Sequence, residues 1–465
     1  MKISKRRNTI AALLILVFLL GSWSDTDPTK KAKKIEASQQ RSGDPQKGKD
    51  YLLNGNYLNS GIPFDIYNSF NANKPQKLID RTGDNENVPP QFNTVRAENN
   101  TKVIAPNCLT CHSEYINGKF IIGLGNNTFD YTQNLASITP FVSMAIVNKY
   151  GIDSPEWHAF EPFKVASEKI NPELQTEVRG VNPADKLTSA LVAHRDPVTL
   201  EWSDEPLLAI PDQTIPTDVP PWWVLKKKNA MFYTAIGRGD FSKFLMASSL
   251  LTLKDSTQAA EIDKSFPDVL SWINTLEAPA YPFVVDQTLA QRGQRIFELN
   301  CSKCHGNYSG KEDYPNLLIP LDVIGTDPAL SDAYTKGTYS TFINWYNKSW
   351  FTKGAHPGKL VIEEGYVAQP LDGIWATAPY LHNGSVPTLD VLLNSKSRPE
   401  YWQRSFNSMD YDSISVGWKY KTLSTKEDVQ TYDTNLEGYG NKGHEFGDDL
   451  SDQERRAVIE YLKTI

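Results

Sequence analysis

Two short motifs of identical spacing contain every cysteine of this chain. Each reads C-x-x-C-H, and together they comprise Cys108, Cys111, His112, Cys301, Cys304 and His305. Four cysteines are too few for a disulfide scaffold in a chain of 465 residues. Their position directly before a histidine therefore constrains the chain more than their number does.

The C-x-x-C-H spacing is the pattern of covalent haem c attachment. Two thiols one helical turn apart can each form a thioether with a porphyrin vinyl group, and the adjacent histidine then ligates the iron. A four-cysteine zinc site, a redox-active C-x-x-C pair and two local disulfides are the alternatives, but none of them requires the histidines. We therefore predict two covalently attached haem c groups, with His112 and His305 as iron ligands.

The first 24 residues have the pattern of a signal peptide. A basic stretch precedes an apolar run over residues 10–20, which is too short for a membrane-spanning helix of about 20 residues. An uncleaved anchor is the alternative. Removal of residues 1–24 takes away four basic residues and no acidic one, which changes the net charge from −7 to −11 and argues against nucleic acid as a partner. We expect a periplasmic or secreted protein with no stable membrane span.

Helical patterns flank the second motif. Apolar residues at helical spacing predict a short amphipathic helix over residues 289–300, which runs directly into Cys301. At the far end, residues 451–454 form a capping box ahead of an apolar stripe through Val458 and Leu462. A first helix leading to C-x-x-C-H, with a last helix packed across it, resembles the class I cytochrome c domain.

The first half of the chain repeats this ending. Residues 265–276 contain a second possible capping box and an apolar helical face that matches residues 458–465 in character, although amphipathic helices generally look alike. Gly48 and Gly293 stand in similar short segments, but Gly48 lies about 52 residues farther from its cysteines. We predict an insertion at that point.

These patterns predict a mainly α fold of two cytochrome c-like domains, each with one covalent haem c. The predicted division is a signal peptide over residues 1–24, a flexible tether over 25–47, a first domain over 48–278 and a second domain over 279–465. The domain boundary falls in a proline-bearing linker. The tether is polar and lysine-rich, without apolar periodicity.

The second axial position of each iron decides what the haem can do. A haem ligated on both sides mainly transfers electrons, whereas an open haem can bind peroxide or dioxygen. The candidate ligands, for each of which a packing or surface role is the default, are His158, His194, His356, His382, His444, Met144, Met231, Met246 and Met409. We favour His444, which lies in a glycine-flanked segment, as distal ligand of the second haem, and His382 as a pocket residue beside it.

Three segments make the chain resemble a known family. They are the Ala-Pro-Tyr-Leu-His-Asn-Gly-Ser loop at 378–385, the Gly-His-Glu-Phe-Gly segment at 443–447, and residues 220–233, which begin Pro-Pro-Trp-Trp. The sequence resembles the di-haem cytochromes related to bacterial cytochrome c peroxidase and MauG, and more closely their rubber oxygenase branch. The resemblance implies a mainly α fold, oxygen binding at the first haem, and electron transfer through a second haem that is ligated on both sides.

Carried over to this sequence, the resemblance makes His112 and His305 proximal ligands and His444 the distal ligand of the second haem. It also places Trp222 or Trp223 near the haems. The phenylalanine-aspartate-leucine-serine signature that precedes the first haem of true peroxidases is absent, and the chain is shorter than rubber oxygenases. Both departures weaken peroxidase activity and rubber cleavage as specific assignments.

Residues 222–228 place two tryptophans beside three lysines. Tryptophans can pack on porphyrin or lie between haems, and lysines can pair with haem propionates. The alternative is an ordinary buried loop with a solvated lysine run. Trp222, Trp223 and His382 are the candidate catalytic residues. Asp240 suits a turn with a surface salt bridge better than it suits a general base.

Two functions remain open. One is an oxidoreductase that activates peroxide or dioxygen at the first haem and uses the second haem as an electron relay. The other is a carrier that moves electrons between periplasmic partners. The insertion before Cys108 makes the two halves unequal and favours the enzyme. We expect a periplasmic electron donor or acceptor as partner, and peroxide, dioxygen or an organic compound as substrate.

Overall fold

The computed structural model describes residues 27–71, 76–310 and 313–465. The structure is 39% helical and 13% strand, with the strands distributed over several small sheets. The fold is therefore mixed α/β, and the prediction of a mainly α fold is wrong. The predicted signal peptide lies outside the described residues. Among the described residues, no helix has both the length and the apolar character needed to cross a membrane.

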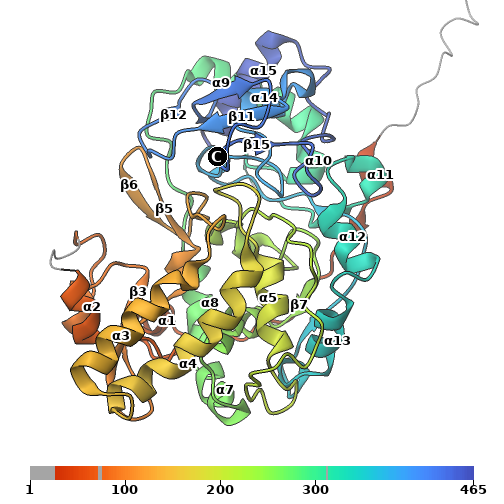
Figure 1. Cartoon of the computed structure of the whole chain (residues 1–465). Coiled ribbons are helices and arrows are strands. Elements are labelled where there is room, and N and C mark those ends of the chain that lie inside the picture. The colour runs from red at the N-terminus through yellow and green to blue at the C-terminus, as the bar shows by residue number, and fades with distance from the viewer. Residues whose placement is uncertain (1–26, 72–75, 311–312) are drawn as a thin grey trace, which may run out of the picture.

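Most of the helices are short (Figure 1). The α-helices of the described residues are α1 (Pro45–Asn54), α2 (Phe64–Phe70), α3 (Thr139–Tyr150), α4 (Pro155–Ile170), α5 (Ala184–Ala193), α6 (Phe241–Leu245), α7 (Ser256–Asp263), α8 (Phe266–Ile273), α9 (Gln287–Asn300), α10 (Ser302–His305), α11 (Leu321–Ile324), α12 (Ala329–Thr335), α13 (Ser340–Lys348), α14 (Leu389–Leu392) and α15 (Asp452–Leu462).

The strands pair only antiparallel, in small sheets. In the three-stranded sheets the strand orders are β1 (Lys33–Lys34), β8 (Leu317–Ile319), β10 (Tyr366–Val367); β2 (Ile62–Pro63), β4 (Lys102–Pro106), β3 (Phe92–Arg96); and β14 (Tyr420–Leu423), β11 (Tyr401–Arg404), β15 (Tyr432–Asp433). The two-stranded sheets pair β5 (Ser113–Ile116) with β6 (Lys119–Ile122), β7 (Gly237–Gly239) with β9 (Gly358–Leu360), and β12 (Tyr411–Asp412) with β13 (Gly417–Trp418).

The strand β3 shows why the fold class was mispredicted. Along β3, Asn93 and Val95 are buried while their neighbours are partly exposed or exposed, which is the alternation of a strand with one covered face. This strand and its partner β4 lie in the stretch that the sequence marked only as an insertion. The helical stripes beside the second motif and at residues 265–276 carry no information about it.

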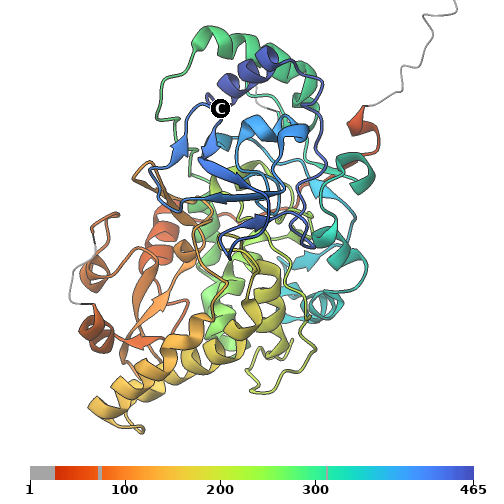
Figure 2. The same cartoon turned by 45° about the horizontal axis from the view of Figure 1, so that its top comes forward.

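The helices that flank the second motif cross as predicted. Figure 2 shows the green helix α9 against the dark-blue helix α15, and the two share the most extensive helix contact of the structure. Ser451 and Glu454 form the predicted capping box at the start of α15. At the crossing, a Cβ atom on Gly293 would lie 1.8 Å from the carbonyl oxygen of Ala457. Only glycine permits the two backbones to approach this closely.

The first half contains an equivalent crossing, between α1 and α8. A Cβ atom on Gly48 would lie 1.9 Å from the carbonyl oxygen of Asp268. Gly48 and Gly293 therefore have the same role in two separate helix pairs, which supports the internal repeat. The predicted capping box at Ser265 is wrong, because its side chain makes no cap hydrogen bond and its backbone is already helical.

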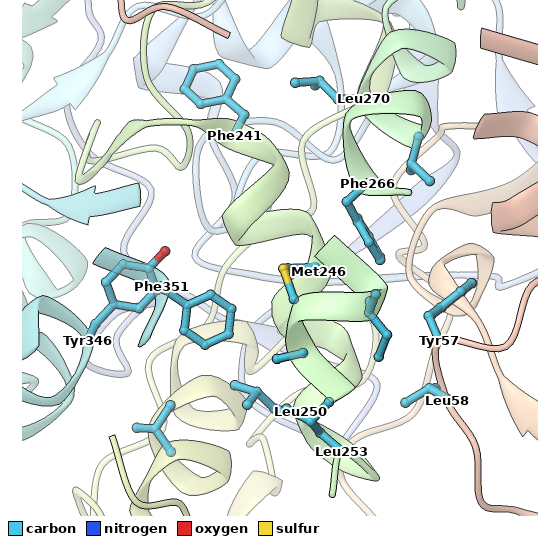
Figure 3. Packing of buried hydrophobic residues seen from close by; sticks show 14 of the residues in the cluster. Tyr57, Leu58, Phe241, Met246, Leu250, Leu253, Phe266, Leu270, Tyr346 and Phe351 are labelled. Atoms are coloured by element: carbon cyan, nitrogen blue, oxygen red, sulfur yellow. The ribbon is translucent and has the colours of Figure 1, made fainter. Parts of the chain in front are cut away.

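The buried clusters combine residues from both predicted domains. Figure 3 shows Tyr346 and Phe351 packed in one cluster with Tyr57, Met246 and Phe266. Helices α12 and α13 run from the C-terminal part of the chain along the N-terminal part (Figure 1), and both contribute to this cluster. Residues from both sides of position 279 share one buried cluster, so the predicted domain boundary there stays a prediction.

Residues 27–47, predicted as a flexible tether, pack against the rest of the protein from Asp27 onward. Strand β1 pairs with β8, and Ile35 is buried. Arg41 donates to Asp240 at 2.5 Å and to Asp263 at 2.6 Å. Low hydrophobicity misled the prediction because this segment is held by backbone pairing and ion pairs rather than by an apolar face.

Candidate functional site

One large cavity contains most of the predicted ligands of the second haem. It encloses about 1390 Å³ of space, part of it open to solvent, and its lining includes Cys301, Cys304, His305, His444 and His382. Apolar side chains make up most of the remaining wall. A largely apolar hollow with a few convergent polar groups is the usual form of a cofactor site.

Local helix geometry places the second motif in this cavity. Helix α9 ends at Asn300, Cys301 is its C-cap, and the single turn α10 follows. The amide of His305 donates to the carbonyl of Cys301 at 3.0 Å, so one helical turn separates the first thiol from the histidine. Both thiols and the imidazole therefore line one cavity, as attachment to one porphyrin requires.

The His305 ring is oriented by a backbone acceptor. Its Nδ1 lies 2.8 Å from the carbonyl oxygen of Gln369. A carbonyl oxygen can only accept, so Nδ1 carries the proton and Nε2 keeps its lone pair for a metal. An imidazole that donates its other N–H to a backbone carbonyl is the usual arrangement of a metal-ligating histidine.

His444 faces His305, with 6.0 Å between the ring centres. Two imidazoles that ligate one metal ion from opposite sides, with metal–nitrogen bonds of about 2 Å, have ring centres about 6 Å apart. The Nδ1 atom of His444 is buried without a hydrogen-bond partner. The pair thus fits a haem iron held between two histidines.

The backbone around His444 is fixed from several sides. Gly443 has φ +73°, and a Cβ atom there would lie 2.1 Å from the carbonyl carbon of Gly325. The amide of His444 donates to the carbonyl of Ile324 at 2.7 Å, and the Arg398 guanidinium donates to the carbonyls of Gly443 and His444. The glycine is required because the loop passes directly over the end of α11.

Burial keeps these histidines neutral. Desolvation lowers the pKa of His112, His382 and His444 to about 3, and it lowers the pKa of His305 as well. At pH 7 all four imidazoles are therefore uncharged and have the lone pair that a metal ligand needs. All four cysteines are free thiols in the structure, so each sulfur remains available for a thioether.

The first motif lies in a different environment. Cys108–Thr110 form a 3-10 turn capped by Asn107, whose side chain accepts from the Leu109 amide. His112 is stacked on Trp222 with 4.5 Å between ring centres, and its Nδ1 is buried without a partner. Among the described residues, no ring contact of His112 involves a second histidine. The two motifs therefore differ in the ring that neighbours their histidine, Trp222 beside His112 and His444 beside His305.

The two predicted tryptophans are both buried, but they point to different parts of the protein. Trp222 packs on His112, whereas the Trp223 indole donates to the carbonyl of Asp372 at 2.7 Å and packs in a second buried cluster with Trp375 and Trp418. The segment Pro220–Val224 also contributes Pro220, Pro221 and Val224 to the large cavity. This segment therefore connects the first motif with the site of the second.

The three lysines that follow do not form a solvated run. Lys226 donates to Glu277 at 2.6 Å, Lys227 to Asp372 at 2.6 Å, and Lys228 to the side chain of Gln369 at 2.8 Å. Lys228 is buried, and desolvation lowers its pKa to about 7. Lys228 thus lies next to the residue that orients His305.

His382 lines the same cavity as His305 and His444. Its ring stacks on Tyr366 with 4.1 Å between ring centres, and the edge of Tyr233 contacts it as well. Asn383 fixes the loop by donating to the carbonyls of Gly438 and Gly440. The loop therefore places His382 in the cavity wall, while His444 is the histidine that faces His305.

The structure places the other candidates away from this cavity. His158, His356, Met144 and Met409 are exposed on the surface. His194 stacks on Trp202, and Met231 and Met246 pack in or against the large apolar cluster. Asp240 is buried in an ion pair with Arg41, so the predicted surface salt bridge is a buried one.

Sequence reasoning missed Gln369 and Asp218. The backbone carbonyl of Gln369 orients His305. Because every residue has such a carbonyl, this contact leaves no signal in the sequence. Asp218 lines the cavity and accepts a hydrogen bond from Tyr233 at 3.0 Å. A single aspartate in a loop has no pattern that distinguishes it from a surface residue.

Comparison with known proteins supports part of this picture. Residues 365–403 match the family described as RoxA-like, cytochrome c-like. Two proteins of Sinorhizobium fredii (strain NBRC 101917 / NGR234) are similar to the chain, namely "Uncharacterized protein y4iM", 27% identical over 300 residues, and "Uncharacterized protein y4iJ", 28% identical over 240 residues. The matches cover 55% and 39% of this chain, and the chain spans 66% and 39% of these relatives.

The family match includes the cavity residues Tyr366, Gln369 and His382. It supports a c-type cytochrome related to the RoxA-like proteins, and such a cytochrome binds haem c covalently and transfers electrons. The number of haems, the ligand assignments and the wider resemblance to di-haem peroxidases stay predictions.

Proposed function

We propose that the protein is an exported di-haem c-type cytochrome that works as an oxidoreductase. The haem attached at Cys301 and Cys304 relays electrons, and the haem attached at Cys108 and Cys111 activates peroxide or dioxygen. A periplasmic electron donor or acceptor is its partner. Export agrees with haem c chemistry, because the attachment takes place outside the cytoplasm.

The facing pair of His305 and His444 is the observation on which the proposal mainly depends. A separation of 6.0 Å between the ring centres leaves room for one iron between the two imidazoles and for no further ligand. Both rings are neutral at pH 7, because burial lowers the pKa of each. A haem held in this way changes oxidation state without binding substrate, which suits an electron relay.

The unequal surroundings of the two motifs support different tasks for the two haems. His112 contacts Trp222, and within the described residues no second histidine ring meets it, so an iron bound there keeps a position for peroxide or dioxygen. The segment Pro220–Val224 joins the two sites, with Trp222 on His112 and Val224 in the second cavity. Electrons can therefore pass between the sites within one short segment.

Spectra of the purified protein test this assignment. We expect one low-spin haem that ignores added ligands, and one haem whose EPR and optical spectra change with peroxide and, after reduction, with carbon monoxide. The first haem responds because it has an open axial position. Two low-spin haems that ignore both reagents would contradict the enzyme and leave a non-catalytic electron carrier.

A further inference from the structure

A partly buried carboxyl group lies in the wall of the second haem's cavity, and it is not one of the ligands discussed above. Asp218 lines this cavity and accepts a hydrogen bond from the Tyr233 hydroxyl, which also lines it, at 3.0 Å. The Asp218 amide donates to the carbonyl of His382 at 2.7 Å, so the backbone is fixed as well. Neither side chain has a role in ligating iron, attaching haem or connecting the two motifs.

The surroundings of Asp218 hold little compensating charge. Arg404 is the cation that acts on it, and the Arg404 guanidinium is itself engaged with Asn127. The phenol of Tyr432 lies within electrostatic reach, and the His382 ring is neutral because burial lowers its pKa to about 3. Desolvation raises the pKa of Asp218 to about 7, while the hydrogen bond from Tyr233 opposes this shift. Asp218 therefore changes its protonation state near neutral pH.

A haem iron in this cavity changes its charge by one unit when it is reduced. Charges interact strongly in a poorly solvated cavity, and a bound metal ion is often the largest local charge. A carboxylate in the wall is stabilised by ferric iron more than by ferrous iron. Its affinity for a proton therefore rises when the iron is reduced.

On the basis of the proposed function, we propose that Asp218, held by Tyr233, exchanges a proton in step with the redox state of the haem bound by His305 and His444. On reduction, the iron takes one electron from a one-electron donor and the Asp218 carboxylate takes one proton from water. On oxidation, the electron leaves to a one-electron acceptor and the Asp218 carboxyl releases the proton. Tyr233 is a positioning residue that stabilises the carboxylate by donating to it.

Lys228 is a second group whose pKa lies near 7, and its side chain is buried. Its ammonium group donates to the side chain of Gln369, and Lys228 is not part of the cavity lining. Asp218 borders the cavity that would hold the haem, whereas Lys228 reaches it only through Gln369. We therefore expect the redox-linked proton at Asp218 and not at Lys228.

Redox titration of the two-haem protein over a series of pH values tests the proposal. In the wild type, the midpoint potential of the low-spin haem falls as pH rises around pH 7, with a slope approaching about 59 mV per pH unit, which corresponds to one proton per electron. Asp218→Asn removes the titrating group and flattens this dependence. Tyr233→Phe removes the hydrogen bond that stabilises the carboxylate. The pKa of Asp218 therefore rises, and the pH dependence of the midpoint potential remains but occurs at higher pH.

Asp185→Asn is the matched control. Asp185 is a second aspartate that accepts from a tyrosine, Tyr334, but it lies outside the cavity lining. This variant and Lys228→Gln keep the wild-type slope. The coupling is overturned if the midpoint potential of a two-haem wild type does not change with pH, or if Asp218→Asn keeps the wild-type pH dependence. The proposed function stands in either case. A protein without a low-spin haem overturns both.

Discussion

Replacement of His444 by alanine converts the one low-spin haem to high spin, and the low-spin EPR signal is lost. The imidazole of His444 faces His305 at 6.0 Å between ring centres, so its removal leaves the iron with one protein ligand. An iron with an open position also binds carbon monoxide after reduction. Both changes are measured by EPR and optical spectroscopy on the purified variant.

His382→Ala is the control for this experiment. His382 lies in the same cavity wall, but its ring stacks on Tyr366 and not across from His305. We expect this variant to keep the low-spin signal. An unchanged spectrum in His444→Ala, or loss of the low-spin signal in His382→Ala alone, would contradict the ligand assignment.

Gly293→Val strongly destabilises the C-terminal part of the protein. A side chain at residue 293 collides with the backbone of α15, because a Cβ atom would lie 1.8 Å from the Ala457 carbonyl oxygen and 2.3 Å from its carbonyl carbon. Relief requires α9 and α15 to separate, which costs about 3 kcal/mol of the free energy of unfolding. The cost appears as a lower Tm in thermal unfolding followed by circular dichroism.

Gln291→Val introduces the same side chain on the exposed face of the same helix. There it lowers the free energy of unfolding by only about 0.5 kcal/mol, because valine has a lower helix propensity. Gly48→Val is the counterpart in the first half, and we expect it to behave like Gly293→Val because Gly48 meets α8 in the same way. Equal Tm values for Gly293→Val and Gln291→Val would show that the crossing is not as close as described.

The local features of the second motif could be predicted from the sequence because they depend on neighbours in the chain. The helix that leads into Cys301 and the capping box at Ser451 follow from residues within one or two turns. The same reasoning failed at Ser265, where the residue type was right but the backbone is helical and the hydroxyl forms no cap. A capping pattern indicates a helix start only where the preceding chain is extended.

The arrangement around the iron site depends on residues that are far apart in the sequence. The glycine beside His444 was a usable signal, since it permits the close passage over Gly325. The hydrogen bond from His305 to Gln369 spans 64 residues and involves only the backbone of Gln369. Asp218 acquires its raised pKa from burial in the folded protein. No local pattern in the sequence could have predicted this hydrogen bond or the raised pKa of Asp218.

The fold class was mispredicted for a related reason. The helical stripes that were recognised lie beside the second motif and at residues 265–276, whereas the first motif lies between the short strands β4 and β5. Strands of two to five residues give too few alternations to be recognised beside strong helical signals. Their pairing is decided by the packing of distant segments.

The number of covalently bound haems is the most direct test of the proposed di-haem cytochrome. A pyridine haemochrome assay, combined with the mass of the intact denatured chain, counts haems attached through thioethers. We expect two haems per chain in the wild type, and one in the double variant Cys301→Ser/Cys304→Ser and in Cys108→Ser/Cys111→Ser. Fewer than two haems in the wild type would contradict the assignment of both C-x-x-C-H motifs as haem attachment sites.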